Sequence, residues 1–206
     1  MKRTHLTSWH FALVLAAVVL FLTGRNHPSN SQTETLAPTW EVYFSPRGGA
    51  TSAIIKTLDQ ARKSILVQAY SFTSVPIASA LVRARRRGVD VHVILDKSQR
   101  TQKYSCTDLL VHSGIKTYLD ASHAIAHNKV MIIDNHIILT GSFNFSKAAE
   151  EANAENVLII QEVDLAARFL SNWRIHQTHS DPYSQRRTSH KQPRNSLIGV
   201  LTNTNS

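Results

Sequence analysis

Short segments rich in β-branched residues alternate along this chain with segments whose apolar residues recur at helical spacing. Trp40 to Phe44 alternates as a strand does, and Thr51 to Lys63 places its apolar residues on one face of a helix. Ser64 to Tyr70 then has the composition of a second strand. This order is typical of an α/β domain, because each helix buries its apolar face against a sheet. We therefore expect a central mixed sheet flanked by helices.

The same alternation continues along the rest of the domain. Helices are expected at 76–87, 107–112 and 163–178, and strands at 89–95, 115–119 and 154–161. The sequence predicts one folded domain over residues 40–179.

The two ends of the chain differ in composition from this domain. Residues 1–24 carry basic residues and then an apolar run from Phe11 to Leu22, which is the layout of an export signal. The run is shorter than the roughly 20 residues of a membrane-spanning helix. We therefore expect an exported protein, periplasmic or secreted, with a membrane anchor at residues 9–24 as the alternative. Residues 25–39 are typical of a flexible linker, and residues 180–206 of a basic, disordered tail.

The charge balance of the chain indicates polyanionic partners. There are 23 Lys and Arg residues against 14 Asp and Glu, a formal net charge of +9. Such an excess attracts nucleic acid and anionic membranes, although it can also serve solubility alone. Four arginines (Arg83, Arg85, Arg86 and Arg87) end a predicted helix, where they either complement the helix dipole or form a phosphate-binding patch. The single cysteine, Cys106, excludes an intramolecular disulfide and a multi-cysteine zinc site.

The segment His127–Asn144 is the most informative for chemistry. Its sequence, HNKVMIIDNHIILTGSFN, predicts two strands joined by a tight turn at Asp134. Residues two apart in a strand project to one face, so His127 and Lys129 point the same way. Ser142 and Asn144 do the same on the returning segment. These four polar side chains are therefore expected to converge.

A cluster of this composition fits a tetrahedral phosphate. His127 is the expected nucleophile, because a neutral imidazole is available near pH 7. Lys129, Ser142 and Asn144 are expected to bind the non-bridging phosphate oxygens, on which negative charge accumulates. Glu155, at the start of the following strand, is the expected partner of the second ring nitrogen of His127.

The fixed positions of this segment match the signature H-x-K-x4-D-x6-G-S-x-N without a gap or substitution. In these residues the chain resembles the phospholipase D superfamily, and the resemblance extends from Trp40 to about Thr178. The chain is most similar to the small single-motif members, a bacterial group of metal-independent endonucleases. The resemblance implies a phospholipase D-like fold with one motif per chain.

The resemblance also implies a two-step reaction through a phosphohistidine. His127 attacks phosphorus, a second histidine protonates the leaving oxygen, and water then releases the product. Since the chain carries one motif, a second His127, Lys129 and Asn144 must come from another copy, so a homodimer with a shared active site is expected. The resemblance gives Asp134 a mainly structural role and lets Glu155 hydrogen-bond the nucleophile. No metal and no other cofactor are expected.

The remaining histidines have weaker signals. A metal site of His123, His127 and Asp134 is an alternative, but that spacing fits no strong metal-binding pattern. No chemistry is expected at the other histidines considered, which are His92, His112, His136, His176, His179 and His190.

Three functions compete at this stage. The first is a non-specific endonuclease on DNA or RNA, favoured by the small single-motif architecture and the basic charge. The second is a phospholipase D that degrades phosphatidyl lipids, favoured by the superfamily and the N-terminal segment. The third is a non-catalytic nucleic-acid-binding protein, against which the intact His127, Lys129 and Asn144 argue.

Overall fold

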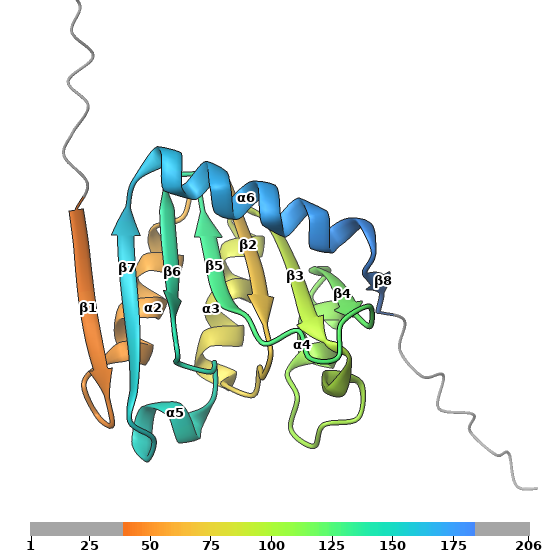
Figure 1. The fold of residues 1–206 in the computed structure, drawn as a ribbon, viewed down its shortest axis with the longest axis horizontal. Helices are drawn as coiled ribbons and strands as arrows, with labels where there is room; N and C mark the ends of the chain where they lie inside the picture. Colours follow the sequence, from red (N-terminus) through yellow and green to blue (C-terminus); the bar gives the residue numbers. More distant parts are fainter. Residues whose placement is uncertain (1–38, 184–206) are drawn as a thin grey trace, which may run out of the picture. The chain divides into compact units, whose positions relative to one another are not determined.

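The computed structural model describes residues 39–183, in which strands and helices alternate as the sequence indicates (Figure 1). The strands are β1 (Thr39–Ser45), β2 (Ser64–Ala69), β3 (Asp90–Asp96), β4 (Lys116–Asp120), β5 (Lys129–Ile133), β6 (Ile137–Gly141), β7 (Glu155–Gln161) and β8 (Asp181–Pro182). The helices are α2 (Ala50–Gln60), α3 (Val75–Arg86), α4 (Thr107–His112), α5 (Lys147–Glu151) and α6 (Val163–Thr178), with a 3-10 turn, η1, at Lys97–Arg100.

These strands form one sheet with the order β1-β7-β6-β5-β2-β3-β4-β8. β2, β3 and β4 are parallel neighbours, and the other neighbouring strands are antiparallel. The expected mixed sheet with flanking helices is therefore confirmed, and with it the α/β class.

Helices cover both faces of this sheet (Figure 1). α2, α3 and α4 lie on one face, where the larger apolar cluster includes Ile54 and Leu81. α6 crosses the other face, where Trp173 packs with Ile94 in a second cluster. The Trp173 indole also donates a hydrogen bond to the carbonyl of Val67 at 2.9 Å. Burying one large apolar side chain contributes about 1.5–3 kcal/mol, so these contacts hold α6 against the sheet.

Most element boundaries fall within one or two residues of the expected ones. The helix expected at 51–63 is an exception, because α2 ends at Gln60 and the backbone of Ala61 has an extended ψ of 138°. Three elements, η1, α5 and β8, were not expected, since each is too short to show a periodic pattern.

The ends of the described part extend slightly beyond the predicted domain. Thr39 already belongs to β1, and β8 pairs with β4. The Tyr183 N–H then donates to the carbonyl of Thr117 at 2.8 Å. The expected export segment, nearly all of the linker and most of the tail lie outside the described residues. Among residues 39–183, no helix is long and apolar enough to cross a membrane.

One end of the sheet brings together the strand ends that matter for function. β2, β3, β4 and β6 finish there, while β5 and β7 begin there. The pairing of β2 with β5 puts Ala69 opposite Lys129, and the pairing of β6 with β7 puts Gly141 opposite Val157. We call this the site end of the sheet. In α/β sheets, ligands commonly bind at the carboxyl ends of the parallel strands.

Candidate active site

His127 and Lys129 lie at the site end, where the loop after β4 enters β5. Lys129 is the first residue of β5 and is only 8% exposed, whereas His127 is exposed. The Lys129 Nζ donates a hydrogen bond to the backbone oxygen of His127 at 2.9 Å. The buried ammonium group of Lys129 is thus held against the backbone of His127, whose side chain is exposed.

Tyr70, for which the sequence predicted no role, contacts both His127 and Lys129. It follows β2, and its N–H donates to the carbonyl of Asn128 at 2.8 Å. Its ring centroid lies 4.6 Å from that of His127, and the Lys129 Nζ lies 5.3 Å from the ring centre. Tyr70 lies near His127 and Lys129 only because β2 pairs with β5. The sequence around Tyr70 therefore did not indicate that it belongs to the site.

The Lys129 ammonium is electrostatically unusual. Burial lowers the pKa of Lys129, while the negative charge of Glu155 acts in the opposite direction. A cation that has lost part of its hydration interacts more strongly with an incoming anion, because less water screens the attraction. Lys129 is therefore suited to stabilising a phosphate group beside His127.

Glu155 lies at the site end as the first residue of β7. Its Oε1 accepts a hydrogen bond from the side-chain amide of Asn153 at 3.1 Å. Among the described residues, no hydrogen bond joins the Glu155 carboxylate to the His127 ring. The structure thus places Glu155 near Lys129, and its orienting contact with His127 stays a prediction.

Gly141 and Ser142 make a close approach to β7 at the end of β6. Gly141 has a φ of 153°, and a Cβ there would lie 2.2 Å from the backbone oxygen of Asn156. Only glycine fits this position. The Asn156 N–H donates to the Ser142 Oγ at 3.1 Å, which holds the serine at the site end.

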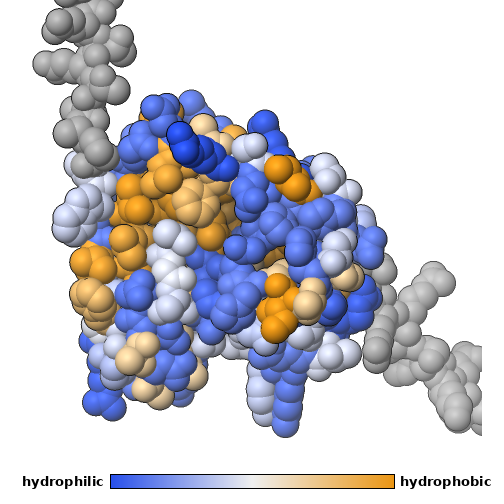
Figure 2. Space-filling model, in the orientation of Figure 1, coloured by the Kyte–Doolittle hydropathy of each residue, from blue (hydrophilic) through white to orange (hydrophobic). Residues whose placement is uncertain are grey.

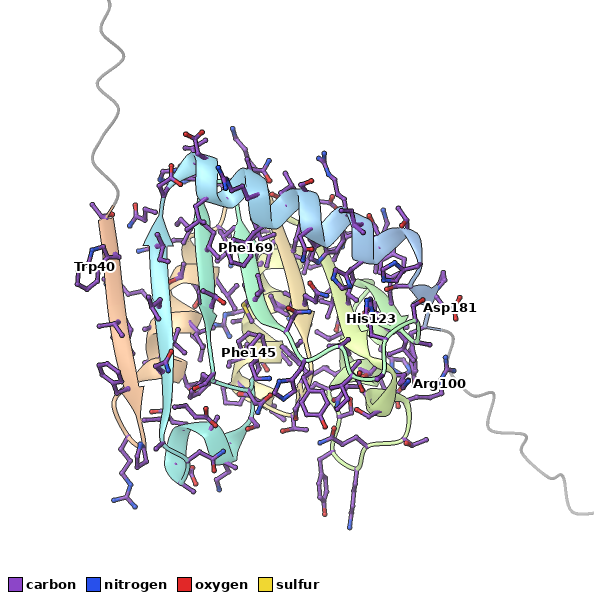
Figure 3. The ribbon with its side chains drawn as sticks, viewed as in Figure 1. Trp40, Arg100, His123, Phe145, Phe169 and Asp181 are labelled. Atoms are coloured by element: carbon purple, nitrogen blue, oxygen red, sulfur yellow. The ribbon has the colours of Figure 1, made fainter. Side chains whose placement is uncertain are left out.

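Asn144 follows two residues later, between two buried phenylalanines. The ring of Phe145 (Figure 3) packs edge-on against Phe72, with centroids 5.7 Å apart, and so ties this segment to the residues that follow β2. Within residues 39–183, the buried Oδ1 of Asn144 has no hydrogen-bond partner. The Asn144 side chain therefore has an unused hydrogen-bond acceptor at the site end.

Asp134 lies at the opposite end of β5 and does not reach this cluster. It is separated from Lys129 by a strand of five residues, about 17 Å. Its carboxylate accepts hydrogen bonds from the backbone N–H groups of Arg62, Lys63 and Ser64 at 2.9, 2.7 and 2.9 Å. Burial alone would raise the pKa of Asp134, but these hydrogen bonds lower it. Asp134 thus holds the start of β2, which is a structural position.

The arginines at the end of α3 make structural contacts. Arg83 forms an ion pair with Asp59 at 2.9 Å, and Arg85 donates to the carbonyl of Gly114 at 3.2 Å. Arg87 donates to the carbonyl of Leu58 at 2.9 Å. These bonds favour the structural interpretation of the cluster over a phosphate-binding patch.

A different group of cations lies at the site end, in the segment between β3 and α4. Residues 97–104 read KSQRTQKY and contain three basic residues and no acidic one. Tyr104 is 76% exposed, and the Nζ of Lys103 lies 4.9 Å from its ring centre. We call residues 97–104 the basic loop.

The other reactive side chains do not join the site. Burial raises the pKa of Cys106 to about 11, so its thiol stays protonated at neutral pH. The alternative metal trio of His123, His127 and Asp134 is not formed, because Asp134 lies at the far end of the sheet and His123 contacts Asp120 instead.

Comparison with known proteins identifies the family to which this geometry belongs. The family model described as "Cardiolipin synthase, PLD-like domain" matches residues 54–174. The chain belongs to the phospholipase D superfamily. The recognition of this superfamily from the signature in His127–Asn144 is therefore confirmed.

Several members of the superfamily are similar to this chain. A protein named phospholipase D from Rickettsia conorii is 45% identical over 130 residues, which are 63% of this chain and 65% of that protein. A mitochondrial cardiolipin hydrolase from Mus musculus is 31% identical over 122 residues, 59% of this chain and 55% of that protein. The match thus spans just under two thirds of the first relative and about half of the second.

Two solved structures have the same fold over their whole length. Nuc from Salmonella typhimurium, a phospholipase D family member, is 39% identical with a TM-score of 0.69, and the match covers 72% of this chain and 100% of Nuc. NucT from Helicobacter pylori is 26% identical with a TM-score of 0.66, covering 71% of this chain and 100% of NucT. The superfamily fold is therefore complete in the described part of the chain.

Proposed function

We propose that this protein is a metal-independent endonuclease that cleaves DNA or RNA through a covalent intermediate on His127. The observation that carries the chemistry is that the exposed imidazole of His127 and the buried ammonium group of Lys129 both face the ring of Tyr70. The imidazole supplies a nucleophile, and the ammonium group supplies the charge that a metal ion would otherwise provide.

The first step forms a bond between a ring nitrogen of His127 and phosphorus and breaks the bond to the leaving oxygen. Lys129 balances the charge on the non-bridging oxygens, and Ser142 and Asn144 donate hydrogen bonds to them. A second imidazole gives its proton to the leaving oxygen. In the second step, that imidazole takes a proton from water, the water oxygen attacks phosphorus, and the nitrogen–phosphorus bond breaks.

The second imidazole is assigned to another copy of the chain. The sequence contains one copy of the motif, and His127 is exposed at the site end, where a second copy can approach it. A symmetric homodimer would place two His127 rings across its two-fold axis. The functional unit proposed is therefore a dimer with one shared active site.

Mixing experiments test the dimer. Wild-type protein is unfolded and refolded with an equal amount of His127→Ala protein, so that the copies redistribute. If both His127 rings are required, the activity per total wild-type chain falls to about half, because mixed dimers are inactive. An unchanged activity per wild-type chain, together with sedimentation as a monomer, contradicts the shared site.

The basic loop supports nucleic acid as the substrate. Its cations lie at the site end, and its exposed Tyr104 offers a face on which a base can stack. Phosphates flanking the scissile one would contact the cations, which suits a polymer of phosphodiesters better than a single headgroup.

A substrate panel tests this assignment. Purified protein is incubated in EDTA, at a temperature at which it stays folded, with plasmid DNA, RNA, and vesicles of labelled phosphatidylcholine or cardiolipin. Cleavage of nucleic acid by wild type, but not by His127→Ala protein, is expected. Turnover of lipid alone overturns the substrate assignment, and activity that requires added Mg²⁺ overturns the mechanism.

A phospholipase is the second candidate, and two observations favour it. Relatives at 45% and 31% identity are named phospholipase D and cardiolipin hydrolase. In addition, Trp40, Val42 and Phe44 are exposed on one face of the edge strand β1, where Figure 2 shows hydrophobic surface. A membrane could cover this surface. The lipid vesicles in the panel distinguish the two candidates.

A further inference from the structure

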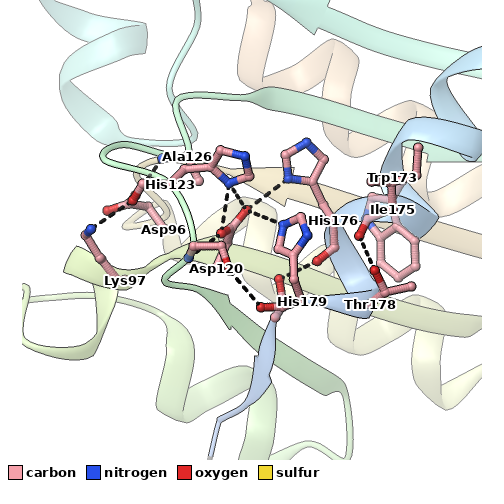
Figure 4. Close-up of polar contacts among 12 residues, drawn as sticks. Asp96, Lys97, Asp120, His123, Ala126, Trp173, Ile175, His176, Thr178 and His179 are labelled. Carbon is pink, nitrogen blue, oxygen red and sulfur yellow. Dashed lines mark hydrogen bonds and ion pairs between the residues drawn. The ribbon is translucent and has the colours of Figure 1, made fainter.

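Asp120, the last residue of β4, lies at the centre of three histidine rings (Figure 4). Its carboxylate is fully buried. The Nδ1 of His176, the Nδ1 of His123 and the Nε2 of His179 lie 2.9, 3.0 and 3.4 Å from the same atom, Oδ2. The three ring centroids are 4.9, 5.1 and 5.2 Å from one another. Three ring nitrogens thus converge on one anionic oxygen.

This arrangement offers more donors than one oxygen accepts well. A carboxylate oxygen has about two lone-pair sites, yet three ring nitrogens point at Oδ2. Oδ1 already accepts a hydrogen bond from the Ser122 N–H at 3.1 Å and also lies 3.1 Å from His123. Imidazole nitrogens need not donate to the carboxylate, since they also bind metal ions through their lone pairs. A cation between them and Asp120 would use all three nitrogens at once.

We propose that this cluster is a binding site for a divalent transition metal ion and that Zn²⁺ is the ion it binds. The ligands are Asp120, His123, His176 and His179. Their ligand atoms all lie within 4.8 Å of one another. Ligand atoms of a tetrahedral zinc site lie about 3.3 Å apart, so the rings need to close by about 1.5 Å or less. The side chains of His123 and His179 are 44% and 30% exposed, which leaves them room to rotate and the ion a route from solvent.

The charge of Asp120 suits a cation site. Burial alone would raise the pKa of Asp120, but its hydrogen bonds with His176, His123 and the Ser122 N–H hold the pKa at about 2. The carboxylate is therefore ionised at neutral pH. Three histidines and one carboxylate make four protein ligands, which is the closed set typical of a structural zinc site rather than a catalytic one.

The position of the site indicates what the ion would hold together. The sheet order places β4 three strands from β5, so Asp120 lies about 14 Å from Lys129 and outside bonding reach of a phosphate there. The ligands come from β4, the end of α6 and the loop that leads to His127. That loop is also fastened by Asp96, which accepts from the Ala126 N–H at 2.8 Å. A bound ion would therefore fix the segment carrying the nucleophile.

Zinc binding to the whole chain tests the proposal without reference to catalysis. Protein is stripped with a chelator, the chelator is removed, and Zn²⁺ is titrated by calorimetry, with metal content measured after gel filtration. Wild type should retain one equivalent per chain and unfold at a higher temperature with zinc than without it. His176→Ala should lower the affinity by more than about 100-fold and lose the thermal shift. His179→Gln, at a partly exposed position, repeats the test if His176→Ala protein does not fold.

Two histidine variants serve as controls. His136→Ala removes an exposed histidine from the turn between β5 and β6 and should bind zinc as wild type does. His127→Ala should also bind normally, because the site excludes the nucleophile. The proposal is overturned if wild type retains no zinc, if folded His176→Ala and His179→Gln proteins bind zinc as wild type does, or if His127→Ala abolishes binding. None of these results depends on which phosphodiester the protein cleaves.

Discussion

The ring of Tyr70 packs against the imidazole of His127 with their centroids 4.6 Å apart, and the Lys129 ammonium faces the same ring at 5.3 Å. Tyr70 belongs to the segment after β2, whereas the other two residues flank the start of β5. The contact therefore links two neighbouring strands of the sheet at the reacting group. Because the imidazole is otherwise exposed, the tyrosine ring limits its orientations.

Removing the Tyr70 ring should slow the reaction. Aromatic contacts of this kind are worth about 0.5–1.5 kcal/mol, so Tyr70→Ala should lower kcat by about 2- to 13-fold. Tyr70→Phe keeps the ring and should retain most of the rate, as measured on a chromogenic phosphodiester. Equal kcat values for Tyr70→Ala and wild type would show that the ring does not position His127.

The fall of kcat/KM at alkaline pH should report the deprotonation of Lys129. Burial lowers the pKa of this lysine, so its positive charge is lost at a lower pH than that of an ordinary lysine. We expect kcat/KM to fall as pH rises through that value, because kcat/KM follows ionisations of the free enzyme. Lys129→Arg should remove this fall, at a reduced plateau. Tyr70→Phe is the control. If this variant loses the alkaline fall of kcat/KM, the fall does not report Lys129.

Asp134→Asn should reduce stability with little effect on kcat. The substitution weakens the hydrogen bonds that Arg62, Lys63 and Ser64 donate, at a cost of about 1–3 kcal/mol in the free energy of unfolding. Asparagine also tolerates the positive φ of 52° at this turn, so the turn itself is preserved.

The pH dependence of that loss follows from the pKa of Asp134, which is lower in the folded protein than in the unfolded chain. Its stabilisation is complete above the unfolded value of about 3.9 and is lost as the pH falls through the folded value. In urea unfolding, the free energy of unfolding of Asp134→Asn should therefore be lower than that of wild type at pH 7. The two values should agree in strong acid. Equal stabilities at pH 7 contradict the structural role, and a large loss of kcat in folded protein would point to a catalytic one.

The basic loop should contribute to nucleic-acid affinity. In a His127→Ala background, which prevents cleavage, Lys103→Ala should reduce the slope of log K against log salt by about 0.7–0.9, the amount expected for one phosphate contact. Lys116→Ala removes an exposed lysine from the opposite end of β4 and serves as the matched control. Equal slopes for the two variants would place the bound strand away from the loop.

The sequence was sufficient for the features that depend on local pattern. The order of strands and helices follows from periodicity, and the turn at Asp134 and Asn135 follows from residues that tolerate positive φ, here 52° and 56°. Four site residues could be selected because the spacing of the signature places them at, or next to, the ends of two adjacent strands: His127, Lys129, Ser142 and Asn144.

The contacts between distant segments could not be predicted in the same way. Tyr70 contacts His127 only because β5 pairs with β2 in the sheet. The periodicity of the sequence does not predict which strands pair. Asp120 and His176 are 56 positions apart and come together because α6 crosses the sheet to the end of β4. The histidines at 176 and 179 therefore lacked a visible carboxylate partner, and the sequence assigned them no chemistry.

Trapping of the covalent intermediate tests the central claim most directly. During turnover of a labelled oligonucleotide, the reaction is stopped in alkaline denaturant, since nitrogen–phosphorus bonds of histidine hydrolyse in acid. The protein is then digested and analysed by mass spectrometry. The account predicts a nucleotide adduct on the peptide that contains His127, and no adduct and no cleavage with His127→Ala protein. Wild-type rates from His127→Ala protein, or an adduct on a different residue, would contradict it.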